Sequence, residues 1–271
     1  MHALRMTGIK VCGLRFLSPL SPEKAAEALT ARLPRGAAVF TPNAEIMHQA
    51  FKSRIFYNKL AAADFLLPDG QGICIAARFH GRRLTRIPGV DVGKALVKTG
   101  RRVFLFGGRE GVAARAAERL QSEFPEARIV GYRSGYYADG EEKRIVEEIA
   151  KAKPEILLVC LGSPKQEAWI LRYRLRFPEA ILIGLGGSID VYAGDISRAP
   201  RLLQNAGLEW AYRALRDPAR LPRLASLPLF LAEAYFFAER ERFRRGIPPL
   251  FPSNCTKIKK KTPVNEKNVR I

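Results

Sequence analysis

The stretch Thr41-Pro42-Asn43-Ala44-Glu45 directly follows a short apolar run, Ala37-Ala38-Val39-Phe40. A second apolar run, Phe65-Leu66-Leu67, closes in a similar way on Pro68-Asp69-Gly70. Apolar runs of this length that end on proline and a polar residue are typical of buried parallel strands followed by loops. These two stretches therefore predict neighbouring turns of an α/β sheet, and the rest of the chain is interpreted from them.

Three polar side chains occupy those predicted turns. Parallel α/β sheets bind ligands at the carboxyl ends of their strands, so we expect Thr41, Asn43 and Asp69 to project into one crevice. Asp69 lies between proline and glycine, where little side-chain bulk blocks access to the carboxylate. Pro-Asp-Gly is also an ordinary turn sequence, and its local chemistry alone does not choose between the two interpretations.

The remainder of the first 195 residues repeats one order: apolar strand, turn, amphipathic helix. Several of the turns contain glycine. This order predicts an α/β fold, a Rossmann-like parallel sheet flanked by helices on both faces, over residues 1–195. The expected strands are 7–17, 37–40, 65–67, 102–106, 127–132, 156–161 and 180–184, and the expected helices are 21–32, 45–60, 71–79, 112–124, 141–151 and one that carries Trp169.

Residues 80–91 are predicted to form a basic loop. Its default interpretation is a solvated charged segment, but Arg86 is singled out because Pro88-Gly89 stiffens the turn beside it.

The composition changes at residue 196. Residues 196–245 are predicted to be an Arg-rich helical appendage, and the tail 246–271, rich first in proline and then in lysine, is predicted to be disordered. Within the appendage, 227–238 is almost wholly apolar, too short to span a bilayer and interrupted by Pro228. A basic segment with an aromatic face favours an interfacial helix, and the alternative is a core helix packed on the sheet.

The charge of the chain indicates an anionic partner. Lys and Arg number 46 against 26 Asp and Glu, which gives a net charge of +20. Nucleic acid, acidic lipid and a phosphorylated substrate would each fit this excess. The four cysteines form no C-x-x-C pair and the three histidines no metal-binding pair, so a reduced, cytosolic chain without a zinc site is expected. No signal-peptide-like segment opens the chain.

Glycine turns at the predicted strand ends favour a nucleotide. Gly107-Gly108, Gly162 and Gly186-Gly187 would let backbone N–H groups approach a phosphate, and three such turns suit a nucleoside diphosphate. Neither the G-x-G-x-x-G dinucleotide fingerprint nor a P-loop is present, which disfavours an oxidoreductase and a P-loop enzyme.

A set of motifs in fixed order makes the interpretation specific. They are T-P-N-x-E (41–45), P-D-G (68–70), R-x-P-G-V-D (86–91), F-G-G (106–108), G-S-P-K-Q-E (162–167), G-G-x-x-D with x-A-G (186–194) and R-A-P-x-x-x-Q-x-x-G-L-E-W (198–210). Together they resemble the WecG/TagA/CpsF family of bacterial glycosyltransferases over roughly residues 8–223. No motif extends the resemblance beyond Arg223.

The resemblance implies an enzyme that transfers a sugar, such as N-acetylmannosamine or its uronic acid, from a UDP-sugar to a sugar on a polyprenyl-diphosphate carrier. It implies inversion at the transferred sugar, no metal or other cofactor, and a product used for surface polymers such as teichoic acid. It also implies peripheral association with the cytoplasmic face of the membrane, an appendage that completes the active site of the catalytic domain, and a possible homo-oligomer.

Residue roles carry over by position. Asp69 matches the proposed general base, Thr41 and Asn43 match residues near the sugar, and Gln166 matches a glutamine of the same crevice. Arg86 matches an arginine implicated in holding phosphate. The remaining candidates for substrate binding are Gly107, Gly108, Gly162, Lys165, Gly186, Gly187 and Asp190.

Arginines are expected to replace a metal at the leaving diphosphate. The acidic D-x-D pair that metal-using transferases often carry is absent from the chain. One or two of Arg213, Arg216, Arg220 and Arg223 are expected to reach the diphosphate, and the others to meet anionic lipid. The rival interpretation, an α/β module that binds nucleic acid, explains the charge but lacks any nucleic-acid signature.

Overall fold

The computed structural model describes residues 8–138, 140–200, 202–203, 212, 225–247 and 250. At its centre is an eight-stranded sheet with the order β1-β2-β4-β3-β8-β7-β5-β6. The strands are β1 Gly8–Val11, β2 Leu14–Leu17, β3 Ala37–Phe40, β4 Phe65–Leu66, β5 Arg102–Gly107, β6 Arg128–Arg133, β7 Ile156–Cys160 and β8 Ile181–Gly184. β1 pairs antiparallel with β2 and the other strand pairs of this sheet are parallel, which confirms the predicted α/β class.

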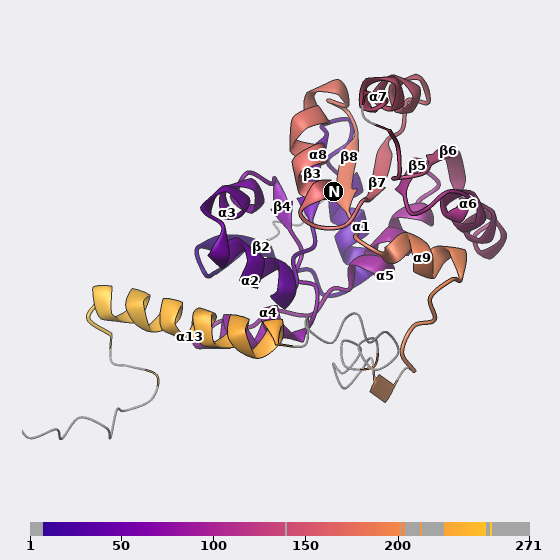
Figure 1. The fold of residues 1–271 in the computed structure, drawn as a ribbon. Helices are drawn as coiled ribbons and strands as arrows, with labels where there is room; N and C mark the ends of the chain where they lie inside the picture. The colour runs from indigo at the N-terminus through magenta and orange to yellow at the C-terminus, as the bar shows by residue number, and fades with distance from the viewer. Residues whose placement is uncertain are drawn as a thin grey trace, which may run out of the picture.

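Helices cover both faces of the sheet (Figure 1). One face carries α1 Pro22–Thr30, α5 Gly89–Val97, α6 Val112–Glu123 and α9 Ser188–Ala193. The other carries α2 Ala44–Lys52, α3 Arg54–Ala61, α4 Gln71–Phe79, α7 Glu142–Lys151 and α8 Lys165–Tyr173, which continues into the 3-10 turn Arg174–Arg176. Each face buries its own apolar cluster, so the sheet lies between two cores.

The handedness of the crossovers explains the two layers. Connections that move toward β6, such as β5 to β6 through α6, place their helix on the face of α1 and α5. Connections that move toward β1, such as β7 to β8 through α8, place it on the opposite face. Both follow from the right-handed rule for parallel strands. As a result, the loops after β3, β4, β5, β6, β7 and β8 meet at one edge, here called the carboxyl edge.

Several predicted elements need correction. The strand region 7–17 is a hairpin that turns at Cys12 and Gly13, both at positive φ. The predicted helix 45–60 is two helices, because Ser53 ends α2 and its hydroxyl accepts the Phe56 N–H that opens α3. Ile55, in the second of these helices, is 73% exposed. The basic loop is shorter than predicted, since α5 already begins at Gly89.

The last described helix, α13 Ser226–Arg244, packs against α2 and α4 on the outside of one layer (Figure 1). The prediction that Pro228 interrupts this segment is wrong. Pro228 is the third residue of the helix, where an N–H has no intrahelical acceptor, so its ring is tolerated. One face of α13 is buried through Phe230, Ala234 and Ala238, so the core-helix alternative holds for that face, with helices rather than the sheet as its partner.

Candidate active site

The sequence-predicted site residues that the structure describes gather at the carboxyl edge. The loop after β3 supplies Thr41 and Asn43, and the loop after β4 supplies Asp69. The turn after β5 supplies Gly107-Gly108, the turn after β7 leads to Lys165 and Gln166, and the turn after β8 supplies Gly186-Gly187 with Asp190 in the helix that follows. Arg213, Arg216, Arg220 and Arg223 lie outside the described residues, as do Arg201 and the tail after residue 250.

Asp69 is half-buried in the short loop between β4 and α4. Its backbone N–H donates to the Pro42 carbonyl at 3.2 Å, which joins its loop to the turn after β3. Arg86 is brought to the same loop because the N–H of its neighbour Ile87 donates to the Pro68 carbonyl at 2.9 Å. The carboxylate and the guanidinium are thus carried by two segments that are bonded to each other.

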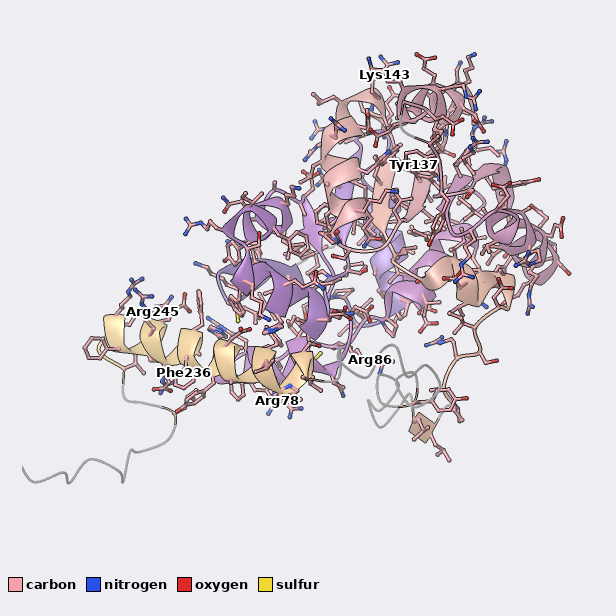
Figure 2. All side chains as sticks on the ribbon, viewed as in Figure 1. Arg78, Arg86, Tyr137, Lys143, Phe236 and Arg245 are labelled. Atoms are coloured by element: carbon pink, nitrogen blue, oxygen red, sulfur yellow. The ribbon has the colours of Figure 1, made fainter. Side chains whose placement is uncertain are left out.

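The charges of Asp69 and Arg86 both affect the pKa of the Cys74 thiol. Burial raises the pKa of Cys74 to about 11, with Asp69 adding to the rise and the positive charges of Arg86 and Arg78 opposing it. Both charges therefore act on the Cys74 thiol, near the start of α4. Figure 2 shows Arg86 at the end of the molecule where α4, α5 and α9 gather.

Thr41 and Asn43 use their side chains within the protein. Thr41 is buried, and its hydroxyl donates to the Gly184 carbonyl at 2.8 Å, across from β3 to β8. Asn43 caps α2, where its side-chain oxygen accepts the Ile46 N–H at 3.0 Å. Both residues lie at the carboxyl edge, as the sequence predicted, and these hydrogen bonds fix the backbone there. Their predicted proximity to a sugar stays a prediction.

Gln166 is 1% exposed, in the first turn of α8. Its side-chain oxygen accepts the Gly186 N–H at 2.8 Å, and its side-chain nitrogen donates to Glu167 at 3.0 Å. Because both the oxygen and the nitrogen of its side-chain amide are hydrogen-bonded within the protein, Gln166 holds the turn after β8 in place.

The glycine turns serve different purposes. Gly107 has φ +147°, and a Cβ there would lie 2.3 Å from the Cys160 carbonyl oxygen, so the approach of β5 to β7 requires glycine. Around Gly162 and Gly186 a Cβ would meet no atom within 4 Å. These two turns leave open space at the carboxyl edge, which is where a ligand could approach the backbone.

Lys165 adds a cation beside that space. Its side chain is exposed, and its ammonium group lies 3.3 Å from the Gly135 carbonyl oxygen and 4.6 Å from the centre of the Tyr137 ring. The ring also stacks against Phe106, at 6.1 Å between ring centres. Lys165 therefore bridges the loops after β6 and β7 with its charge directed along the carboxyl edge.

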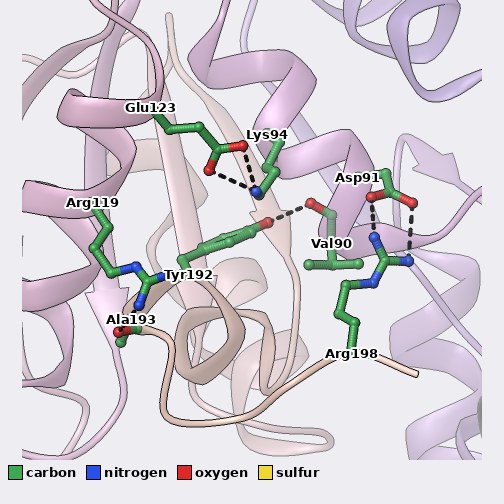
Figure 3. Close-up of polar contacts among 8 residues, drawn as sticks. All are labelled: Val90, Asp91, Lys94, Arg119, Glu123, Tyr192, Ala193 and Arg198. Carbon is green, nitrogen blue, oxygen red and sulfur yellow. Dashed lines mark hydrogen bonds and ion pairs between the residues drawn. The ribbon is translucent and has the colours of Figure 1, made fainter. Parts of the chain in front are cut away.

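A pair that the sequence did not reveal fastens the segment after α9. The Arg198 guanidinium binds both carboxylate oxygens of Asp91, at 2.5 and 3.3 Å, as Figure 3 shows. In the same view Tyr192 donates to the Val90 carbonyl at 2.8 Å. Both contacts join α9 and the chain beyond it to α5. The sequence analysis placed Arg198 in the motif 198–210 and Asp91 in the motif 86–91, but no local pattern pairs the two residues.

Within the described residues, no three His, Cys, Asp or Glu side chains come together in a way that could hold a metal ion. None of the helices in this part of the chain combines the length and apolar composition that crossing a membrane requires.

Comparison with known proteins gives consistent results. The model of the glycosyl transferase WecG/TagA/CpsF family matches residues 9–245. An N-acetylglucosaminyldiphosphoundecaprenol N-acetyl-beta-D-mannosaminyltransferase of Bacillus subtilis (strain 168) is 40% identical over 200 residues, 72% of this chain and 77% of that protein. Proteins of the same name from Bacillus spizizenii and Staphylococcus aureus (strain MW2) are 38% and 32% identical, covering 73% and 71% of this chain and 78% and 77% of their own lengths.

Proposed function

This chain belongs to the WecG/TagA/CpsF family of glycosyltransferases, and on that premise we propose that it transfers N-acetylmannosamine, or a related hexose or uronic acid, from UDP to a polyprenyl-diphosphate-linked sugar. The names of the curated relatives support this choice of sugar and of acceptor. The product would serve a surface polysaccharide or teichoic acid.

The observation that carries the proposal is the position of Asp69 at the carboxyl edge, in a loop bonded to the turn after β3 and beside Arg86. The Asp69 carboxylate takes the proton of the acceptor hydroxyl as that oxygen attacks the anomeric carbon. The bond from that carbon to the UDP oxygen breaks on the opposite side, so the configuration inverts. A base positioned in this way contributes about 10²–10⁴ in rate.

Cations of the protein stabilise the leaving diphosphate in this proposal. Arg86 and Lys165 lie at the carboxyl edge, and the turns at Gly162 and Gly186 leave room for phosphate oxygens near the backbone. Fixed positive charge near developing negative charge lowers the barrier without a metal ion. One or two of Arg213, Arg216, Arg220 and Arg223 are proposed to add to it, and they lie outside the described residues.

The outward face of α13 is proposed to bind the anionic inner surface of the cytoplasmic membrane. Leu229, Phe236 and Phe243, here called the outer stripe, recur every seven residues and are 48%, 69% and 85% exposed. Figure 2 shows Phe236 and Arg78 along the lower side of α13 in that view and Arg245 at its far end. An aromatic stripe bordered by arginines suits the boundary between headgroups and acyl chains, and it would bring the enzyme to a lipid-linked acceptor.

The test replaces Asp69 by asparagine, which keeps the size and removes the base. With a panel of UDP-sugars and a lipid-diphosphate acceptor, Asp69→Asn is expected to lower kcat by about 10²–10⁴. UDP affinity, measured by calorimetry, should stay near that of the unmodified protein. Asp195→Asn is the control, because that exposed carboxylate forms an ion pair with Arg115 at 2.6 Å and is not among the candidate site residues. Near-normal turnover in Asp69→Asn would remove Asp69 from the role of base.

A further inference from the structure

Glu167 is a buried acid next to Gln166. It is 1% exposed, and one carboxyl oxygen accepts the Gln166 side-chain N–H at 3.0 Å. The other oxygen, Oε2, is buried without a hydrogen-bond partner, and so is the hydroxyl oxygen of Ser163. Burial raises the pKa of Glu167, and the hydrogen bond from the Gln166 side-chain amide opposes this rise.

The acceptor on Glu167 fixes which way the Gln166 amide points. With its nitrogen held by Glu167, Gln166 presents its oxygen to the Gly186 N–H, at 2.8 Å. A flipped amide would set N–H against N–H at Gly186 and oxygen against oxygen at Glu167. There is little room for other arrangements, because a Cβ on Gly184 would lie only 3.0 Å from the Gln166 nitrogen.

The turn after β8 is consequently held on two sides. Thr41 binds the Gly184 carbonyl at 2.8 Å, and Gln166 binds the Gly186 N–H. The second of these bonds keeps its direction only while Glu167 accepts from Gln166. Beyond Gly186 lies open space, so the exposed side of the turn is available to a ligand.

We propose that Glu167 is a positioning residue for sugar-donor binding. It holds the Gln166 amide, and through it the Gly186-Gly187 turn, in the shape that receives the nucleoside diphosphate. This inference rests on the proposed function, because it assigns that turn to the UDP part of the substrate. Glu167 itself touches no substrate, so its effect is expected in KM for the UDP-sugar and not in the chemical step.

The experiment compares two substitutions of similar length. Glu167→Gln keeps an acceptor for the Gln166 side-chain N–H, whereas Glu167→Met keeps the volume and removes that acceptor. Glu167→Met is expected to raise KM for the UDP-sugar and Kd for UDP by roughly tenfold, the cost of one unsatisfied buried group. Its kcat and its KM for the lipid acceptor should change by less than about twofold, and Glu167→Gln should restore donor binding.

Two results would overturn the proposal: an unchanged KM and Kd in Glu167→Met, or an equal defect in Glu167→Gln. Circular dichroism checks folding of each variant. If Glu167→Met does not fold, Glu167→Asp replaces it, because the shorter acid withdraws the acceptor from Gln166, and unchanged donor binding there also overturns the proposal. UDP binding by the unmodified protein separates the two hypotheses, since its absence would refute the proposed function itself.

Discussion

The carboxyl edge and α13 are held in place by different means. At the carboxyl edge, side chains such as Thr41 and Gln166 bond directly to the backbone of a neighbouring strand end. α13 instead lies on two other helices through buried apolar side chains such as Phe230, with ion pairs beside them. The first arrangement fixes loop geometry through directional hydrogen bonds, and the second fixes only which face of a helix is covered.

Two histidines carry the polar part of the α13 contact. His48 on α2 pairs with Glu233 at 2.9 Å, and His80 after α4 pairs with Glu241 at 3.3 Å. The other ring nitrogen of His80 accepts the Cys12 N–H at 3.2 Å, so in the neutral ring the proton lies on Nδ1 and is donated to Glu241. The comparison shows that the loops of the carboxyl edge are held by bonds to neighbouring strands of the sheet. By contrast, α13 is attached to the rest of the molecule through one buried face.

The largest effect is expected at the carboxyl edge from Gly107→Ala. The added Cβ would meet the Cys160 carbonyl at 2.3 Å, in a backbone conformation that disfavours side chains. Overpacking and the unfavourable φ together should lower the free energy of unfolding by about 3–5 kcal/mol.

Gly162→Ala is the matched control for this change. It has a positive φ of +77° but open space around its Cβ, so about 1–2 kcal/mol is expected. Urea denaturation of both variants measures the difference. An equal loss of unfolding free energy in the two variants would mean that close packing between β5 and β7 does not determine the destabilisation.

Phe230→Ala should separate α13 from the rest of the molecule. Phe230 is fully buried and stacks on Phe51 at 6.1 Å between ring centres, and truncation of such a residue costs about 3–5 kcal/mol. Because α13 contacts α2 and α4, we expect faster amide hydrogen exchange in α13 with little change in β3 and β8. Equal acceleration in the central strands would show that the two regions unfold as one unit.

Phe236→Ala is the control on the opposite face of the same helix. Its side chain is 69% exposed, so stability should change by less than about 0.5 kcal/mol. If the outer stripe binds lipid as proposed, Phe236→Ala should co-sediment with anionic vesicles less than the unmodified protein does.

The accuracy of the predictions from sequence also differs between the carboxyl edge and α13. An apolar run that ends in Pro or Gly is a local signal, and it located β3, β4 and the turn that carries Asp69 correctly. α13 presents apolar side chains on two faces, as Phe230 and Phe236 illustrate, so no single periodicity marked its buried side, and a proline in its first turn was mistaken for a break.

The sequence did not predict contacts between residues that are far apart in the chain. Asp91 and Arg198 are 107 residues apart, and His48 and Glu233 are 185 apart. No pattern along one chain pairs such residues, and the histidines were considered only as metal ligands. For the same reason the sequence placed Thr41 and Gln166 near the carboxyl ends of strands but did not predict that their side chains would be bonded to β8 and the turn after it.

The smallest expected effect concerns the pH dependence of the α13 contact. Burial lowers the pKa of His80 below 6.5, and the positive charges of Arg245 and Lys10 add to this, whereas Glu241 opposes it. The unfolded chain therefore binds the proton more readily than the folded one. Stability contributed by neutral His80 is fully present above about pH 6.5 and is lost as the pH falls toward the lowered folded value.

Denaturant midpoints measured from about pH 7.5 to about 5 should decline on the acid side, and His80→Asn, which does not titrate there, should flatten that decline. An identical slope in His80→Asn would show that the proton is taken up elsewhere, and the contact between α13 and α4 would then be insensitive to pH.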